Sequence, residues 1–570
     1  MYKIYKEVWE ELTEKDGPFS VKEIEVRGSP MRVYDKAPSN LRDIWQPTKE
    51  FAASEYLVFE DQRWTYDQAH REVSSVASWL KTQGISKGDR VAIAMRNYPE
   101  WILIYWACVT TGIVVVGMNA WWVADEMEYG LSDSKPKVLF ADSERLQRFF
   151  EINSDFAGMK VVGVRTEKGQ PSVIDYQEVK ESSAASPDVD IEPDHDACIF
   201  YTSGTTGYPK GAQLTHRGCV HNIMNLAFAG QLSLSATCRI QMVPEPDPKD
   251  TPIPSALVTT PMFHVTANNC VAHMTTIAGG KLVHMYRWDA NEALRLIERE
   301  KITSMSGVPV MSRELLSHPE FKKYDTSSLL NLGGGGAQLQ PDLVEKIDSS
   351  GEARPSTGYG MTETCGIITS IAGIFFLDKP ESCGPAMPVF ETKIVNADGT
   401  EQPNGHDGEL WVRGAPVIKG YINRPDATRE AITDGWLHTG DVARCDEDGF
   451  IFIVDRVKDM VLRGGENIYC SEVETTLHKI PEISEYECNK YCTLLKFPFV
   501  PLSLFKSNAI GGKVYEITFP ILLLKFLWIC PQNKPTIFLL ELKIFLNFGN
   551  KVCELNSIIF VEDRETLKGG

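Results

Sequence analysis

The sequence predicts an α/β protein with at least two domains, a large multilayered N-terminal domain and a small C-terminal one. The chain has 570 residues, which is more than one compact core usually holds. Between residues 60 and 210, apolar runs alternate with helical patterns, as is typical of βαβ units around a largely parallel sheet. After about residue 485 the composition changes abruptly, so we expect this last segment to differ from the rest.

The first helix of the alternating region is predicted from its ends and its periodicity. Thr65 and Gln68 have the spacing of a capping box, and Gly84 suits the C-terminal end of the helix. Between them, apolar residues recur every three or four positions, as they do on a buried helix face. Buried strands are then expected at five short apolar runs, residues 91–95, 113–116, 137–141, 160–164 and 197–201.

Composition and charge exclude several classes of protein. Hydrophobic residues make up 43% of the chain and charged ones 24%, which is ordinary for a soluble globular protein. Lysine and arginine number 58 against 77 aspartates and glutamates, a formal net charge of −19. Such a chain repels phosphodiester backbones, so we expect no nucleic-acid partner.

Compartment and membrane contact follow from the apolar stretches and the cysteines. The N-terminus has no apolar core of a signal peptide, and the apolar stretch 519–530 is interrupted by Pro520 and Lys525. The 13 cysteines are scattered without a CxxC pair. We therefore expect a cytoplasmic protein with reduced thiols and no integral membrane segment. The sequence does not indicate an oligomeric state.

A loop rich in glycine and hydroxyl residues follows the last predicted strand. Residues 201–211 are Tyr-Thr-Ser-Gly-Thr-Thr-Gly-Tyr-Pro-Lys-Gly. Small residues let the backbone approach an anion closely, and Lys210 adds a mobile positive charge suited to the outer phosphates of a nucleotide. The loop is not a Walker A motif, which needs Gly-Lys-Ser/Thr in succession. A phosphate site is thus predicted, with a surface turn as the alternative.

This loop resembles the phosphate-binding signature of the adenylate-forming superfamily, which includes acyl-CoA synthetases, luciferases and peptide-synthetase adenylation domains. Further segments resemble family motifs in the family's order: Pro261–His264, Gly334–Ala337, Gly358–Glu363, His438–Asp441, Asp455–Asp459 and Arg463–Asn467. The resemblance covers roughly residues 30–480. It implies a large adenylating domain over residues 1–457, with a distorted β-barrel around 380–455. A small α+β domain would follow over 458–570, with Lys458 as the hinge.

The resemblance also implies which residues bind the nucleotide. These are Thr202, Ser203, Gly204, Thr205, Thr206 and Gly207 in the loop, Gly335, Gly336, Ala337 and Tyr359 at adenine, and Asp441 and Arg456 at ribose. A carboxylate can accept hydrogen bonds from both ribose hydroxyls, and a guanidinium adds a fixed fork of donors. The alternative for Tyr359 is a packed core tyrosine.

Catalytic and metal-binding residues are implied in the same way. Lys210, Thr362, Glu363 and His264 are the catalytic candidates, and Glu363 is also the candidate ligand of Mg²⁺, a hard cation that prefers oxygen. A Thr-Glu pair can instead cap a helix. Phe263, His264, Val308 and Gly335 are the candidates for binding the acyl group. His264 is expected near the adenylate rather than as a general base, and a core histidine is its alternative.

The family's C-terminal lysine, in a Thr-x-x-Gly-Lys pattern, has no counterpart at the matching position. In Thr566–Gly570 the lysine position is taken by Gly570, and Lys568 is two residues early. From Thr493 to Asn550 there are two acids and six lysines amid many Phe, Leu, Ile and Asn residues. A translated intron or frame error would explain this composition, whereas a diverged domain would keep alternating charges. The composition favours the artefact.

The resemblance implies an acid–thiol ligase that uses ATP, Mg²⁺ and CoA as co-substrate. A small-molecule carboxylic acid, expected to be a fatty acid, would be activated to an acyl-adenylate and transferred to CoA. One alternative is an adenylating enzyme with another acceptor, such as a carrier-protein thiol. The other is a non-catalytic nucleotide- or acyl-binding protein, because the C-terminal lysine is missing.

Overall fold

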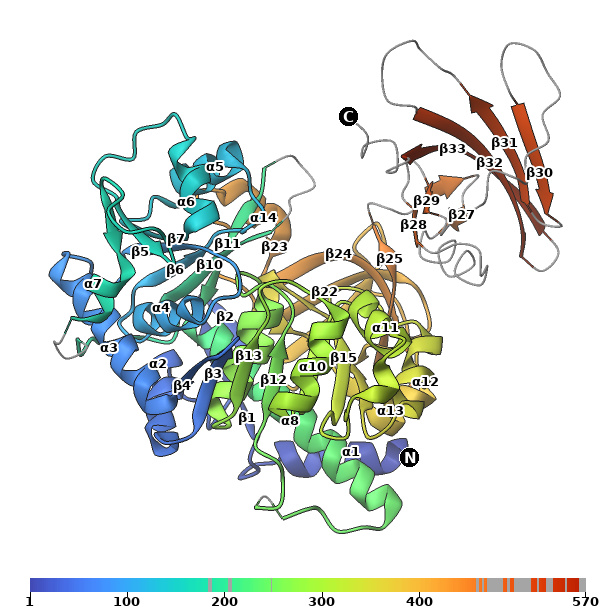
Figure 1. The fold of residues 1–570 in the computed structure, drawn as a ribbon. Coiled ribbons are helices and arrows are strands. Elements are labelled where there is room, and N and C mark those ends of the chain that lie inside the picture. Colours follow the sequence, from blue (N-terminus) through green and yellow to red (C-terminus); the bar gives the residue numbers. More distant parts are fainter. Residues whose placement is uncertain are drawn as a thin grey trace.

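The computed structural model describes residues 1–182, 187–202, 208–247 and 249–457, and, beyond these, the backbone of several strands between residues 461 and 562. Two α/β layers and a curled antiparallel sheet make up the large N-terminal part (Figure 1). The α/β class predicted for this part is confirmed. The predicted domain boundary at residues 457/458 stays a prediction.

The first α/β layer is built on a mostly parallel sheet. In spatial order its strands are β11 (Lys210–Thr215), β10 (Asp196–Thr202), β6 (Val114–Gly117), β5 (Arg90–Ala94), β7 (Val138–Asp142), β8 (Lys160–Val164) and β9 (Val173–Asp175). All neighbours from β10 to β9 are parallel, and β11 is an antiparallel edge strand. The five predicted buried strands are confirmed, because each overlaps a strand of this sheet.

The second α/β layer has the same character. Its strands, in order, are β19 (Ile371–Ala372), β16 (Arg354–Thr357), β15 (Asn331–Gly334), β14 (Ser304–Gly307), β12 (Ser255–Val258), β13 (Lys281–His284), β3 (Glu55–Phe59) and β4 (Gln62–Thr65). Neighbours from β16 to β3 are parallel, with antiparallel strands at both edges. The carboxyl ends of these parallel strands therefore lie along one edge of the sheet.

Helices cover both sheets. They are α1 (Tyr2–Thr13), α2 (Leu41–Trp45), α3 (Tyr66–Thr82), α4 (Pro99–Val109), α5 (Ala124–Ser134), α6 (Ser143–Phe150), α7 (Tyr176–Lys180), α8 (His216–Gln241), α9 (His273–Ile277), α10 (Ala290–Glu300), α11 (Pro309–Ser317), α12 (Pro341–Ser349), α13 (Gly373–Asp378) and α14 (Pro425–Ala431). The capping box predicted for α3 is confirmed: Thr65 Oγ1 accepts from Gln68 N, and Gln68 Oε1 accepts from Thr65 N. Gly84, predicted at its end, has a φ of +76°, in the left-handed region that favours glycine.

Helix α4 joins the two sheets. Every one of its residues is buried, and it contacts β5 and β6 of the first sheet and β3 of the second. Helix α8 likewise contacts β10 and β11 on one side and β19 on the other. A helix that is apolar all round can only be stable inside a core. The two layers therefore share one interior and hold each other in place.

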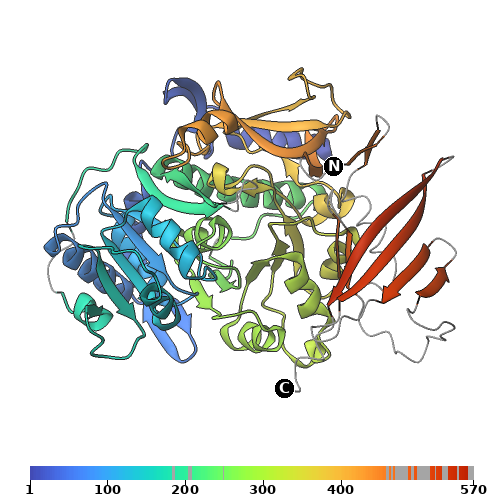
Figure 2. The same cartoon turned by 90° about the horizontal axis from the view of Figure 1, so that it is seen from above.

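The third part is a curled antiparallel sheet at one end of both layers (Figure 2). It consists of β20 (Gly384–Pro385), β25 (Phe450–Arg456), β24 (Trp436–Cys445), β22 (Gly408–Gly414), β21 (Phe390–Val395) and β23 (Ile432–Thr433). It matches the β-barrel-like section predicted around 380–455. A hairpin of β1 (Val21–Val26) and β2 (Ser29–Tyr34) packs against β22 and α8.

After residue 457 the described residues form strands only: β26 (Val461–Arg463), β27 (Glu466–Ile468), β28 (Glu485–Cys488), β29 (Thr493–Lys496), β30 (Val514–Phe519), β31 (Leu522–Trp528), β32 (Ile537–Phe548) and β33 (Lys551–Glu562). Strands β30 to β33 pair in sequence order as an antiparallel sheet. The helices of the predicted α+β domain, the hinge Lys458 and the segment 566–570 lie outside the described residues.

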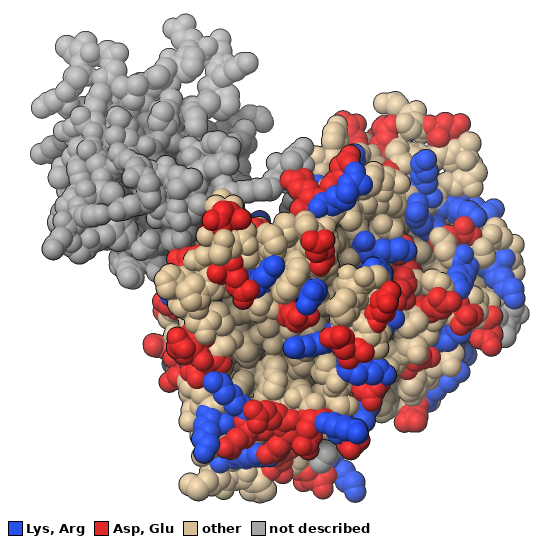
Figure 3. Space-filling model, turned by 180° about the vertical axis from the view of Figure 1, so that it is seen from behind, with Lys and Arg blue, Asp and Glu red and all other residues tan. Residues whose placement is uncertain are grey.

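Two surface properties bear on the sequence predictions. In the part of the chain that the structure describes, no helix is long and apolar enough to cross a membrane. On the face shown in Figure 3, acidic and basic side chains of the described residues are interspersed.

Two phenylalanines test how the first layer is stabilised. Phe140 on β7 is fully buried between Trp79 and Tyr176, whereas Phe150 at the end of α6 is 55% exposed. Phe140→Ala should lower the free energy of unfolding by about 3–5 kcal/mol, because it leaves a cavity in a closed core. The matched change Phe150→Ala should cost less than about 0.5 kcal/mol. Urea unfolding measures both, and similar losses would contradict this assignment of the core.

Candidate nucleotide and acyl site

The predicted site residues lie where parallel strands of both sheets end. Phe263 and His264 follow β12, Val308 follows β14, Gly335 follows β15 and Tyr359 follows β16. Thr202 and Lys210 lie at the carboxyl end of β10 and the start of β11. In open α/β sheets, ligands bind outside the carboxyl ends of the strands. In both sheets, the candidate residues thus lie at the carboxyl ends of parallel strands.

A buried asparagine connects these ends. Asn97, just after β5, donates from Nδ2 to the carbonyl of Thr260 at 2.9 Å and accepts at Oδ1 from the amide of Met262 at 3.0 Å. Thr260 and Met262 belong to the segment after β12, so this side chain joins the first sheet to the second. One amide satisfies two backbone groups and fixes the segment that carries Phe263 and His264.

Strands β10 and β11 hold the predicted phosphate loop between them. Thr202 is paired with Lys210 in the strand register, and its hydroxyl lies 3.5 Å from the Lys210 carbonyl. The two chain ends of the loop are therefore fixed by the hairpin. Ser203, Gly204, Thr205, Thr206 and Gly207 lie outside the described residues, so their predicted contacts remain predictions.

Lys210 and Glu363 meet around a tyrosine. The Lys210 ammonium lies 5.2 Å from the centre of the Tyr421 ring, and the Tyr421 hydroxyl donates to Glu363 Oε1 at 2.7 Å. Glu363 is only 7% exposed. Burial raises the pKa of Glu363, while the hydrogen bond from Tyr421 and the charge of Lys210 oppose the rise. The carboxyl group is thus held beside a cation that favours its ionised form.

A tight turn places Thr362 and Glu363. They lie on a 3₁₀ turn (Thr362–Thr364) between the two short paired strands β17 (Gly360–Met361) and β18 (Gly366–Ile367). A Cβ atom on Gly360 would lie 2.0 Å from the Gly366 carbonyl oxygen. Only glycine lets the strands approach this closely, so Gly360 determines where the Thr-Glu pair lies.

Tyr359 and Asp441 form the second polar cluster. The Tyr359 hydroxyl donates to Asp441 Oδ2 at 2.5 Å, and Arg456 Nε lies 3.4 Å from Asp441 Oδ1. Asp441 and Arg456 face each other on β24 and β25. Burial raises the pKa of Asp441, and the Tyr359 hydrogen bond and the Arg456 charge counteract it. Three of the six residues predicted at adenine and ribose are therefore brought together.

The acyl candidates also converge. A Cβ atom on Gly335 would lie 3.9 Å from Thr266, two residues beyond His264, and one on Gly336 would lie 4.0 Å from Val308. Gly336 has φ +78°, which favours glycine at this turn, and Ala337 follows it on the exposed surface. The turn after β15 therefore lies against the segments that carry His264 and Val308.

Phe263 and His264 occupy different environments. Phe263 is buried, with its ring 5.3 Å from the ring of Trp121, which follows β6. His264 is half-buried with its ring 4.6 Å from that of Phe263, and burial lowers its pKa. A neutral imidazole suits the predicted place beside an apolar acyl group. The place of His264 beside the acyl group stays a prediction.

Sequence reasoning missed Tyr421, Asn97 and Trp121. Tyr421 is 58 residues from Glu363, and Asn97 is about 165 from Met262, so no local pattern connects them. A position just after a predicted strand was the signal available for Asn97. For Tyr421 and Trp121 we find no pattern in the sequence that points to the site.

Comparisons with known proteins agree with this geometry. A family profile described as "AMP-binding enzyme" matches residues 45–422. A feruloyl-CoA synthase of Amycolatopsis sp. is 32% identical over 74% of this chain and 79% of its own length. A long-chain-fatty-acid–CoA ligase of Mycobacterium tuberculosis is 31% identical over 75% of this chain and 80% of its own. The chain therefore belongs to the AMP-binding enzyme family, among its acyl-CoA ligases.

A solved structure supports the same assignment. The o-succinylbenzoate-CoA synthetase of Bacillus subtilis, in complex with its acyl-adenylate intermediate, has a TM-score of 0.66 and 27% identity, covering 82% of this chain and 90% of that one. The resemblance inferred from the motifs is thus confirmed, and binding of ATP or AMP follows from the family.

Two glycine variants test the turn that carries Glu363. Gly360→Ala should displace the turn, because the new methyl group meets backbone rather than a flexible side chain. We expect a loss of at least about 1–3 kcal/mol in stability, with weaker ATP binding. Gly230→Ala on α8 is the matched control, since its Cβ would meet nothing within 4 Å and alanine favours a helix. Scanning calorimetry measures the stability of each variant, and titration calorimetry measures its ATP binding. Unchanged ATP binding in a folded Gly360→Ala protein would show that this turn does not position the nucleotide site.

Proposed function

We propose that the chain activates a carboxylic acid with ATP and transfers the acyl group to CoA. The observation that carries this proposal is the arrangement of two clusters, Lys210–Tyr421–Glu363 and Tyr359–Asp441–Arg456, on either side of one turn. Three residues separate Tyr359 from Glu363, and the charge of Asp441 contributes to raising the pKa of Glu363. A nucleotide could therefore span both clusters.

The proposed nucleotide pose assigns each cluster a part of ATP. Asp441 accepts hydrogen bonds from the ribose hydroxyls, and Arg456, whose side chain is 70% exposed, adds donors at the rim. The Tyr359 ring stacks on adenine beside Gly335, Gly336 and Ala337. Lys210, with Thr202 and the 203–207 loop, binds the phosphates. Such fixed donors stabilise charge that develops in the transition state.

Glu363 fits a Mg²⁺ ion that accompanies the nucleotide. It offers a carboxylate, the ligand type that Mg²⁺ prefers, and its Oε1 is oriented by Tyr421. No group of three or more His, Cys, Asp or Glu side chains suited to a metal occurs among the described residues. Phosphate oxygens of the nucleotide and water would supply further oxygen ligands. Bound Mg²⁺ would neutralise phosphate charge, while Thr362 offers a hydroxyl to the same phosphates.

Two chemical steps would follow. The carboxylate of the acid attacks the α-phosphorus of ATP, which forms the acyl-adenylate and releases pyrophosphate. The thiol of CoA then attacks the acyl carbon, loses its proton and displaces AMP. Phe263, His264 and Val308 would line the acyl group. The predicted domain rotation about Lys458 between the steps concerns residues outside the described part of the chain.

Nucleotide variants test the pose. Lys210→Ala should weaken ATP binding about 10- to 100-fold, as loss of a charged donor costs roughly 1.5–3 kcal/mol, and AMP binding less. Asp441→Asn should weaken ATP and AMP alike, because both contain ribose, and the amide oxygen still accepts from Tyr359. Titration calorimetry measures the four affinities. Lys322→Ala, an exposed lysine away from the site, should change none. AMP affinity unaffected by Asp441→Asn would show that the ribose lies elsewhere.

Pyrophosphate exchange tests the acid. Buried Phe263 and half-buried Val308 favour an apolar acyl group, so fatty or aryl carboxylates should drive ATP–pyrophosphate exchange better than amino acids. The relatives act on both aryl and fatty acids by their names. Exchange driven best by an amino acid would overturn this assignment, and exchange without CoA-dependent product would favour another acceptor.

A truncation tests the segment after the large domain. The missing lysine and the scarcity of acids after Thr493 lead us to expect adenylation slowed by roughly 10²–10³, with nucleotide binding intact. Apolar runs without charges should also promote aggregation, so a chain ending after the large domain, at about residue 457, should be the more soluble one. The two chains are compared for solubility, ATP binding and acyl-CoA formation. Equal solubility of the two chains, with rapid acyl-CoA formation by the full chain, would show that the segment after the large domain is functional. ATP binding by the full chain without ATP–pyrophosphate exchange would favour the non-catalytic alternative.

A further inference from the structure

Two buried asparagines connect the acyl segment to the turn that carries Glu363. Asn222 lies on α8 and Asn269 on a π-helix (Thr266–Ala272) that begins two residues after His264, and both side chains are fully buried. The π-helix, α8 and β18 contact one another. π-Helices are rare, and they occur frequently at functional sites. The two side chains therefore lie between the segment of His264 and the turn of Glu363.

The amide group of Asn222 joins β18 to the π-helix. Its Oδ1 accepts from the amide of Ile367 at 2.9 Å, and its Nδ2 donates to the carbonyl of Asn269 at 3.1 Å. The side chain lies directly against the backbone, since a Cβ atom on Gly366 would be 2.1 Å from Asn222 Oδ1. One side chain thus satisfies a backbone donor next to the turn and a backbone acceptor of the π-helix.

The side chain of Asn269 makes a second link to the same turn. Its Nδ2 donates to the carbonyl of Cys365 at 2.9 Å, and its Oδ1 accepts from Asn268 Nδ2 at 2.8 Å. Cys365 has a φ of +57°, a left-handed conformation that a residue with a Cβ atom rarely adopts. Such a conformation persists only where its surroundings hold it. Asn269 supplies one of the contacts that hold the end of the turn.

The same hydrogen bonds continue to both sites. The amide of Asn268 donates to the carbonyl of His264 at 3.0 Å, which ties the π-helix to the histidine. On the other side, the amide of Cys365 donates to the carbonyl of Thr362 at 3.1 Å, next to Glu363. A short chain of hydrogen bonds therefore runs from His264 to the turn of Thr362 and Glu363.

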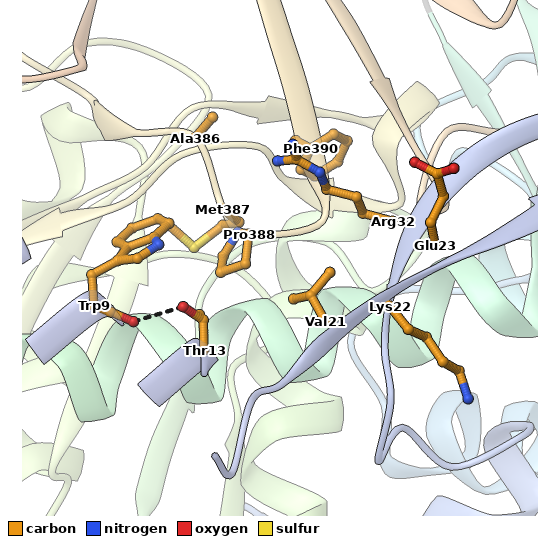
Figure 4. A pocket seen from close by; sticks show the side chains of 10 residues that line it. All are labelled: Trp9, Thr13, Val21, Lys22, Glu23, Arg32, Ala386, Met387, Pro388 and Phe390. Atoms are coloured by element: carbon orange, nitrogen blue, oxygen red, sulfur yellow. Dashed lines mark hydrogen bonds between the residues drawn. The ribbon is translucent and has the colours of Figure 1, made fainter. Parts of the chain in front are cut away.

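These contacts are separate from the surface depression shown in Figure 4. That depression lies between α1, the β1–β2 hairpin and residues 386–390. Among the described residues that line it, none is hydrogen-bonded to Asn222 or Asn269. The two asparagines therefore act in the interior, without a ligand in a surface pocket.

We propose that Asn222 and Asn269 are positioning residues that set the distance between the bound acid and the phosphates of ATP. This role rests on the proposed function, in which the acid lies beside His264 and the phosphates lie beside Glu363. The carboxylate oxygen must approach the α-phosphorus in line with the departing pyrophosphate, and a displacement of about 1 Å can cost about 10²-fold in rate. Both asparagines act through the backbone that they hold, so their loss slows adenylation more than it weakens binding.

ATP–pyrophosphate exchange by the full chain tests this role. With decanoate or cinnamate as the acid, whichever the wild type uses faster, Asn222→Ala and Asn269→Ala should each lower kcat about 10- to 100-fold. The dissociation constant of AMP should stay within about twofold of wild type, because Tyr359 and Asp441 remain hydrogen-bonded to each other. The double variant should lose about as much as the more impaired single one, since both side chains hold one turn.

Asn225→Ala is the matched control. Asn225 is also fully buried on α8, but its Oδ1 accepts from the hydroxyl of Tyr34 at 2.8 Å instead of holding the turn. This change should lower the unfolding temperature about as much as the other two, with kcat within about twofold of wild type. Asn222→Ser should be less impaired in kcat than Asn222→Ala, because its hydroxyl can still donate or accept a hydrogen bond.

Three results would overturn the positioning role. One is wild-type kcat in either Asn222→Ala or Asn269→Ala. Another is a loss of kcat in Asn225→Ala as large as in these two, or AMP binding that weakens as much as kcat falls, since either indicates a general loss of structure. The third is failure of all three Asn222 and Asn269 single variants to fold, because the asparagines would then serve the fold alone.

Failure of the proposed function is distinguishable from these results. It would appear as absent carboxylate-dependent exchange in the wild-type chain itself, and the positioning role would fall with it. Exchange by the wild type, together with unimpaired exchange by the asparagine variants, would remove the positioning role alone.

Discussion

The candidate site depends on the buried side chain of Asn97. It follows a strand of the first sheet, and its amide group bridges two backbone positions after β12 of the second. Helices α4 and α8 hold the two sheets together through apolar contacts, which have no direction. The two hydrogen bonds of Asn97 are directional. Both can form only when the end of β5 and the segment after β12 have one particular relative position. A buried amide left without these partners would cost about 1–3 kcal/mol.

Tyrosine hydroxyl groups stabilise the two buried carboxylates of the site by donating hydrogen bonds to them. Asp441 and Glu363 are each 7% exposed, and burial raises the pKa of both. Each accepts one tyrosine hydroxyl, Tyr359 for Asp441 and Tyr421 for Glu363, and each is near a cation. In the proposed function, ribose hydroxyls and a divalent cation would add partners to these carboxylates. Buried carboxylates whose pKa values are raised are found more often at functional sites than elsewhere.

The sequence predicted most of what depends on neighbours along the chain. The capping box of α3 and the five buried strands needed only local periodicity, and they are confirmed. Motif resemblance placed Lys210, Glu363, Tyr359 and Asp441, and the structure brings them together as two clusters. Their roles remain proposals, because geometry without a nucleotide does not assign them.

What the sequence could not predict are contacts between distant segments. Tyr421 and Asn97 contact their partners only once the two α/β sheets and the curled sheet have packed together. A periodic pattern within one segment therefore cannot predict these contacts. After residue 485 neither periodicity nor charge pattern indicates a fold, so the α+β domain expected over 458–570 rests on the family resemblance alone.

The most direct test is a crystal structure of this chain with bound AMP. The account predicts that both ribose hydroxyls donate to Asp441, that adenine lies against Tyr359 beside Gly335 to Ala337, and that the phosphate points toward Lys210. AMP bound elsewhere, or with its ribose turned away from Asp441, would contradict it.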